Sequence, residues 1–151
     1  MKNTRIRLTL SSVVFGTTIF LATISNGAEA QNDTREAVLL DDESRAFVIH
    51  EMQQFVGGLQ QAIIALSTDD VKSAGAALRP LGMQGMASAP PALMSSVPPG
   101  FRQIGMPIHM AFDQIADAAE RGATVKDVLS SLGMAMNRCV ACHATYRIES
   151  Q

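Results

Sequence analysis

The chain has little of what marks several large functional classes. Its 151 residues include no tryptophan, one tyrosine and two cysteines, and charged residues make up 17%. There is no basic run interleaved with aromatic residues, so nucleic-acid binding is not expected. There is also no glycine-rich loop of the kind that holds phosphate groups. Few stretches alternate between apolar and polar residues, so strands are not expected either.

Residues 1–30 are typical of a secretory signal peptide. Three basic residues within the first seven positions precede the apolar stretch "LTLSSVVFGTTIFLATI". Ala28 and Ala30 then give the small-x-small pattern of a cleavage site before Gln31. A membrane anchor is the alternative, but polar residues interrupt the apolar stretch and the cleavage pattern ends it. The sequence therefore predicts export to the periplasm of a bacterium.

The remaining residues predict a soluble, mildly acidic protein. No second stretch is apolar enough to cross a membrane. We expect a flexible N-terminal segment over 31–41 and one helical domain over 42–151. Four of the six prolines lie in 85–100, which predicts a connector.

Apolar residues at three- and four-residue steps predict four helices in the domain. The first covers 42–66, with Asp41 or Asp42 as its cap. A second helix of about fifteen residues follows a Ser67–Asp70 capping box and is ended or kinked by Pro80. The expected apolar stripe of the first helix consists of Val48, Met52, Phe55, Leu59, Ile63 and Leu66.

The third helix ends near Glu120, and Pro107 either begins it or kinks it. Thr124 and Asp127 predict the cap of the fourth helix. The inward side of this last helix is expected to carry Val125, Val128, Leu132, Ala135, Cys139, Cys142 and Tyr146. The fold class is therefore predicted as all-α, an antiparallel four-helix bundle.

Both cysteines lie in the sequence "CVACH", directly before a histidine. On a helix, Cys139, Cys142 and His143 share an arc of about 100°. Two thiols one turn apart beside an imidazole can hold one haem, with two thioether bonds to its vinyl groups and the histidine on its iron. C-x-x-C-H is the attachment signature of c-type haem. The sequence thus predicts one covalent haem c, enclosed by the bundle near the C-terminal helix.

Other interpretations of the motif meet obstacles. A thioredoxin-like dithiol is expected after a strand, and none is predicted here. Zinc would need about four ligands, and only three residues are together. A disulfide across one helical turn would close a very small loop and stabilise little.

The segment "CVACHATYR" on the last helix of an exported bundle resembles the cytochrome c-prime family. The resemblance implies His143 as proximal iron ligand and a first-helix residue on the opposite side of the haem. Met52 matches the position where low-spin members of that family place a methionine ligand. The chain departs from the family in lacking the tryptophan often found on the third helix and in its proline-rich connector.

Met52 lies on the apolar stripe, whereas His50 is about 200° away among glutamines, so the first helix directs Met52 inward. The alternative distal ligand is His109 on the third helix. Further haem contacts are expected from Phe55, Leu59, Phe112, Tyr146 and Arg147. The other methionines are expected to pack around the cofactor, because their irregular spacing makes a copper-binding set the weaker interpretation.

Two functions follow. With His143 and Met52 both on the iron, the protein is an electron carrier that docks transiently with redox partners, and not an enzyme. With an open iron position, it binds nitric oxide or carbon monoxide. Pairing of two copies through the first two helices occurs in the family, and Gly57 and Gly58 are compatible with it, so a homodimer is left open.

Overall fold

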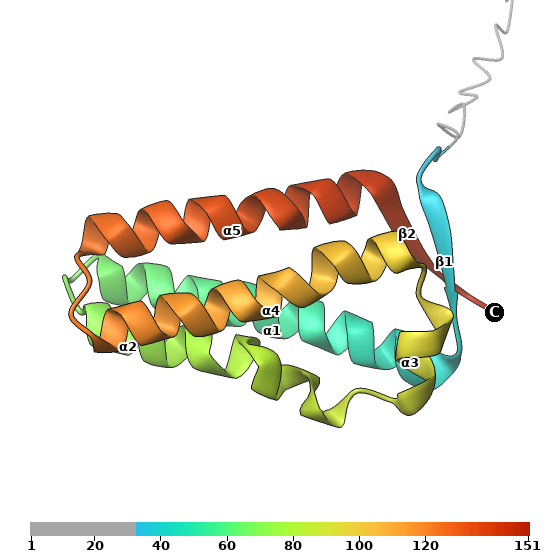
Figure 1. Cartoon of the computed structure of the whole chain (residues 1–151), viewed down its shortest axis with the longest axis horizontal. Coiled ribbons are helices and arrows are strands. Elements are labelled where there is room, and N and C mark those ends of the chain that lie inside the picture. Colours follow the sequence, from blue (N-terminus) through green and yellow to red (C-terminus); the bar gives the residue numbers. More distant parts are fainter. Residues whose placement is uncertain (1–32) are drawn as a thin grey trace, which may run out of the picture. The chain divides into compact units, whose positions relative to one another are not determined.

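A computed structural model describes residues 33–151 (Figure 1), and the predicted signal peptide lies outside them. Helices form most of this part of the chain, which confirms the helical class. Along the chain, α1 contacts α2, α2 contacts α4 and α4 contacts α5. No helix within the described part is long and apolar enough to cross a membrane. The elements are β1 (Glu36–Leu40), α1 (Asp42–Leu66), α2 (Val71–Leu78), the 3₁₀ turns η1 (Arg79–Leu81) and η2 (Met83–Ser88), α3 (Pro91–Ser96), α4 (Pro99–Glu120), α5 (Val125–Thr145) and β2 (Tyr146–Ser150).

Helix α1 has the predicted bounds. The Asp41 carboxylate accepts a hydrogen bond from the Ser44 backbone N–H at 2.8 Å and so caps the first turn. Val48 and Phe55 are buried, as expected. Ile63 was wrongly predicted to be buried: its side chain is 55% exposed, and Ala62 is buried instead. The apolar stripe drifts around the helix, because 3.6 residues per turn do not match steps of four.

The second helix is shorter than predicted. It ends at Leu78, and the chain continues as a 3₁₀ turn around Pro80. Its cap is Asp70, whose carboxylate accepts from the Ser73 backbone N–H at 2.9 Å. The expected pairing of Ser67 with Asp70 is wrong, because the Ser67 hydroxyl donates to the Ile64 carbonyl within α1.

The proline-rich region over 85–100 is more ordered than a plain connector. It contains the end of η2, the whole of α3 and the first residues of α4. Prolines stand at the first turns of α3 and α4, where a missing N–H costs no hydrogen bond. Pro107 therefore lies inside α4 and does not begin it.

The strands were not predicted. β1 and β2 form a parallel pair with Glu36 opposite Tyr146 and Leu40 opposite Ser150. Val38 and Leu40 are almost fully buried. The expected flexible segment over 31–41 is thus a paired strand over 36–40. The expectation that Tyr146 continues the last helix is also wrong, since α5 ends at Thr145.

Helices α2 and α4 lie in close contact at Gly75. A Cβ atom added there would lie 2.6 Å from the Ala119 Cβ and 3.3 Å from the Ala116 carbonyl oxygen. Neither neighbour is the end of a flexible side chain, so the backbones themselves would have to separate. Glycine at this position sets the spacing of the two helices.

We expect Gly75→Ala to lower the free energy of unfolding by about 1–3 kcal/mol because of this overpacking. The matched control is Gly57→Ala on α1, where an added Cβ meets nothing within 4 Å. That change should raise stability by roughly 0.5–1 kcal/mol through helix propensity. Denaturant unfolding followed by circular dichroism measures both, and equal effects of the two substitutions would contradict the close approach.

Candidate functional site

The C-x-x-C-H motif occupies the last two turns of α5. Thr124 and Asp127 form the predicted capping box at the start of this helix. Cys139 and Cys142 are free thiols and half-buried, whereas His143 is exposed. Burial raises the pKa of both thiols, and the nearby Cys139 raises the pKa of Cys142 further. Both sulfurs are therefore neutral thiols at pH 7.

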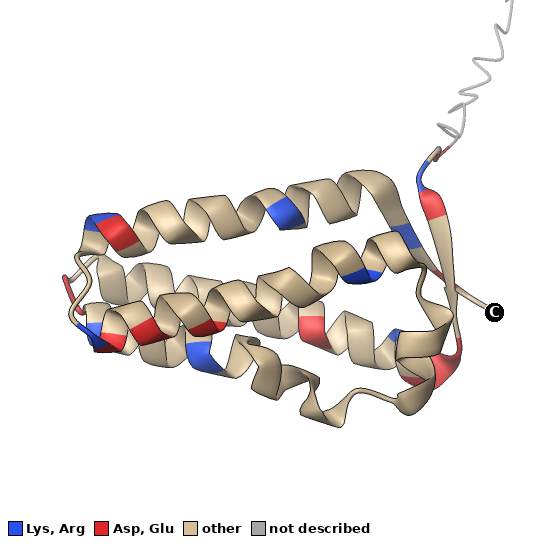
Figure 2. Ribbon diagram, in the orientation of Figure 1, with Lys and Arg blue, Asp and Glu red and all other residues tan. Residues whose placement is uncertain are grey.

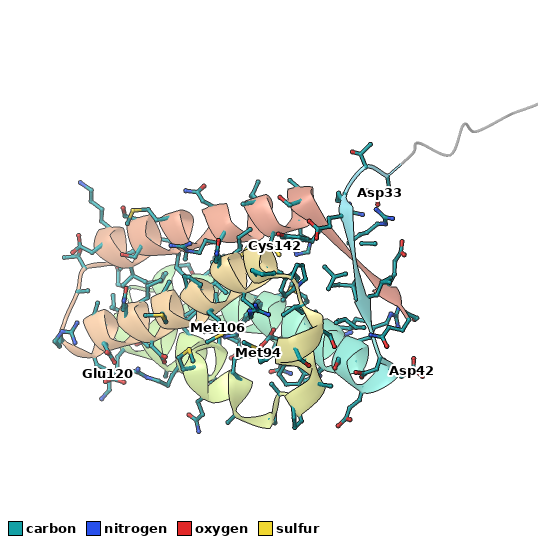
Figure 3. All side chains as sticks on the ribbon, turned by 45° about the vertical axis from the view of Figure 1, so that its right-hand side comes forward. Asp33, Asp42, Met94, Met106, Glu120 and Cys142 are labelled. Carbon is teal, nitrogen blue, oxygen red and sulfur yellow. The ribbon has the colours of Figure 1, made fainter. Side chains whose placement is uncertain are left out.

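The motif faces two adjoining pockets, of about 60 Å³ and about 250 Å³. Cys142, His143, Met52, Val48 and Phe101 line both of them. Cys139 lines the smaller pocket, and Figure 3 shows Cys142 on the inner side of α5. The smaller pocket is completed by Glu51, Ile104, Gly105, Ile108 and Arg138, and the larger by Arg35, Tyr146, Arg147 and Ile148.

Met52 thus lies across a pocket from the motif. It is partly buried and packs against the main core. His50 points outward, with its Nε2 3.4 Å from the Gln54 amide nitrogen. The structure therefore brings Met52, but not His50, to the same pockets as the motif.

His109 is not at the motif. Its ring is 96% buried and lines two other pockets, which contain neither cysteine nor His143. Its Nδ1 lies 2.8 Å from the Leu81 carbonyl oxygen and so must donate a proton to it. Its Nε2 is 3.4 Å from Oε1 of Glu51. The η1 turn, which sequence reasoning read as helix, holds this histidine in place.

Glu51 is a buried polar group that sequence reasoning missed. Its Oε1 has no hydrogen bond within residues 33–151, although His109 is near. Burial raises the pKa of Glu51, and positive charge on His109 opposes that shift. Because Nδ1 of His109 carries a proton, Nε2 of the neutral ring is an acceptor, as is the Glu51 carboxylate. A hydrogen bond between them therefore needs one further proton, on either Nε2 or the carboxyl group. Glu51 lies three residues after Val48 and four before Phe55, and this spacing places it on the same side of the helix as these two buried residues.

The expected haem contacts separate into two groups. Phe55 and Phe112 pack against each other in the core, with ring centroids 5.3 Å apart, and Leu59 packs against the same core. None of these three lines a pocket beside the motif. Tyr146 and Arg147 do, although they reach it from β2. The Tyr146 ring meets Phe101 edge-on at 5.4 Å.

Arg35 on the segment before β1 was not predicted at the site. Its Nη1 donates to the carbonyl oxygens of His143 at 3.2 Å and Tyr146 at 3.5 Å. These carbonyls lie where α5 ends and lack partners within the helix. Arg147 reaches back and donates to the carbonyl oxygens of Asp33 and Arg35. No local pattern could reveal this contact, since it joins residues more than a hundred positions apart.

Figure 2 shows few charged residues along α5 between its first turn and β2. A network joins Arg79 with Asp113, Asp117 and Glu120 where α2 meets α4, away from the motif. Within residues 33–151, no three His, Cys, Asp or Glu side chains gather to hold a metal ion.

Comparisons with known proteins add nothing to this geometry, because no family model, curated protein or solved structure matches the chain.

We expect Arg35→Ala to loosen the junction of α5 and β2, since it leaves the carbonyls of His143 and Tyr146 without their donor. Backbone amides of 146–148 should exchange with solvent roughly fivefold faster, the equivalent of one net hydrogen bond. Arg45→Ala, at an exposed arginine on α1, is the control and should leave these amides unchanged. Hydrogen exchange read by mass spectrometry tests this, and unchanged protection in Arg35→Ala would contradict the role.

Proposed function

We propose that the protein is a c-type cytochrome that carries one haem bound covalently through Cys139 and Cys142 and that transfers electrons. The observation that carries the proposal is the arrangement of the C-x-x-C-H motif opposite Met52 across a shared, largely apolar pocket. Free cysteines one turn apart, both partly turned toward that pocket, meet the first requirement for two thioether bonds.

The residues around the motif suit a haem. Helices α1 and α5 are not among the closely packed pairs, unlike α1 with α2, α2 with α4 and α4 with α5. We call the interface between α1 and α5 at these pockets the seam. It has Val48 and Met52 on one side and the motif on the other. A flat apolar group placed there would contact the apolar side chains that line both pockets.

In this proposal each residue has a separate task. The thiols of Cys139 and Cys142 would anchor the cofactor, and the His143 imidazole and the Met52 thioether would bind its iron. A thioether ligand would raise the reduction potential. The haem supplies a one-electron couple when it is bound. Phe101, Ile104 and Ile108 keep water from that side of the pocket, and Tyr146 closes it at the β2 end.

The finer architecture belongs to the same proposal. We infer an antiparallel four-helix bundle formed by α1, α2, α4 and α5, similar to the cytochrome c-prime family. The signal-like residues 1–30 support a periplasmic carrier. Exposed apolar side chains on α5 within two turns of His143, including Val140 at 69% and Met136 at 46%, support transient docking of a redox partner there.

Protein produced in cells able to mature c-type cytochromes should have the mass of its chain plus one haem. The double variant Cys139→Ser/Cys142→Ser should lose the covalent haem and unfold more easily, because an unfilled pocket of that size costs several kcal/mol. Mass spectrometry and thermal unfolding measure the two effects. A colourless parent whose mass is lower by two hydrogens would instead establish a disulfide and refute the proposal.

Replacing Met52 by alanine should open one side of the iron. The ferric absorption band typical of methionine–iron bonding should disappear, the ferrous form should become high-spin and bind carbon monoxide, and the potential should fall. Met134→Ala, at a methionine 64% exposed on α5, is the matched control and should leave the spectra unchanged.

The parent itself decides between the two haem functions. If the ferrous parent is already high-spin and binds carbon monoxide as readily as the Met52 variant, then Met52 is not a ligand. The protein would then bind small gaseous ligands and would not be an electron carrier.

A further inference from the structure

Three methionines that are scattered in the sequence line one small pocket on another side of α4. Met86 comes from η2, Met94 from α3 and Met106 from α4. Figure 3 shows Met94 and Met106 in the same region of the molecule. The pocket has a volume of about 40 Å³, and His109 and Glu51 also line it. Met86 and Met94 both belong to the proline-rich region 85–100, and η2 and α3 place them beside α4.

These side chains differ from ordinary core methionines. None of the three belongs to either buried hydrophobic cluster. Met94 is 39% exposed, and Met86 and Met106 are partly exposed, so the pocket can be reached from solvent. Glu51 also lines this pocket, and its buried Oε1 makes no hydrogen bond among residues 33–151, with the His109 Nε2 3.4 Å away. A buried oxygen in that state is better satisfied when a positive ligand binds.

We propose that this pocket binds one cuprous ion through the thioethers of Met86, Met94 and Met106. Thioethers are soft, neutral donors that select Cu(I), whereas Mg²⁺, Ca²⁺ and Mn²⁺ require oxygen ligands. The Glu51 carboxylate lies at the same pocket and offsets the charge of a monovalent ion.

The neighbouring charges are compatible with a cation. Arg102 also lines the pocket, but its Nη1 donates to the carbonyl oxygens of Met94 at 2.8 Å and Val97 at 2.7 Å, so its charge is directed to the end of α3. The Nδ1 of His109 donates to the Leu81 carbonyl oxygen, so only its Nε2 is close to Glu51. The site uses neither cysteine and is independent of haem attachment.

The test is anaerobic competition between the mature protein and a chromophoric Cu(I) chelator, with copper supplied as Cu(I). If mass spectrometry finds free thiols, they are alkylated first, so that the result does not depend on the haem. The parent should take up one equivalent. Met94→Leu/Met106→Leu should weaken binding at least about tenfold, since even indirect contacts to a metal are worth that much.

Met134→Leu/Met136→Leu, at two exposed methionines of α5, is the matched control and should bind like the parent. No stoichiometric uptake by the parent, equal losses in both double variants, or displacement of Cu(I) by excess Zn²⁺ would each overturn the proposal.

A second measurement needs no variant to fold. Ag(I), a monovalent ion that prefers soft donors as Cu(I) does, is added without reductant to parent labelled with ¹³C at its methionine methyl groups, after alkylation of any free thiols. The resonances of Met86, Met94 and Met106 should shift first. Shifts confined to Met52 or to the exposed methionines of α5 would refute the site.

Discussion

The wide separation of the α1 and α5 backbones, compared with the other neighbouring helix pairs, is the constraint on which the position of the site depends. The pairs α1 with α2, α2 with α4 and α4 with α5 pack closely. At Gly75 the backbones of α2 and α4 are so close that an added methyl group would not fit. The interface between α1 and α5 is not among these closely packed pairs, and two pockets lie beside it at the motif. Both thiols of the motif and Met52 face that seam. The position of the candidate site thus depends on which helix pairs pack closely as well as on the motif itself.

The two strands complete this arrangement at the end of α5. A helix that ends beside an open pocket leaves carbonyl groups without partners, and His143 is in that last turn. Arg35 donates to these carbonyls, and the parallel pairing of β1 with β2 joins the chain on either side of the helices. A second small core of Val38, Leu40, Val48, Leu93 and Val97 lies beneath the strands and ties them to α1 and α3. The last turn of α5 is therefore held by residues from outside the helix.

Local sequence signals predicted several local features, although the expected Ser67–Asp70 capping box was wrong, and they predicted long-range structure poorly. The bounds of α1, the capping box of α5 and the inward direction of Met52 depend on neighbours within a few positions, and all three agree with the structure. Strand β1 was missed because Val38 and Leu40 gain their burial only from residues far along the chain. The same limit applies to His109: its neighbours in sequence indicate an inward histidine, but only the η1 carbonyl of Leu81 determines which pocket it faces. The haem itself is implied by the motif and stays a prediction.

Glu51 and Met52 illustrate how one turn of α1 serves two chemically different pockets. Neighbouring residues on a helix differ by about 100°, so Met52 faces the thiols while Glu51 reaches both the seam and the methionine-lined pocket. A carboxylate placed between them is unfavourable for folding, because burial opposes its charge and its Oε1 has no hydrogen bond among residues 33–151. A glutamine or an apolar residue would avoid that penalty, so packing alone does not account for glutamate here. His109, with its Nε2 3.4 Å from Oε1, offsets part of that penalty, and a positive group bound on either side would offset more of it.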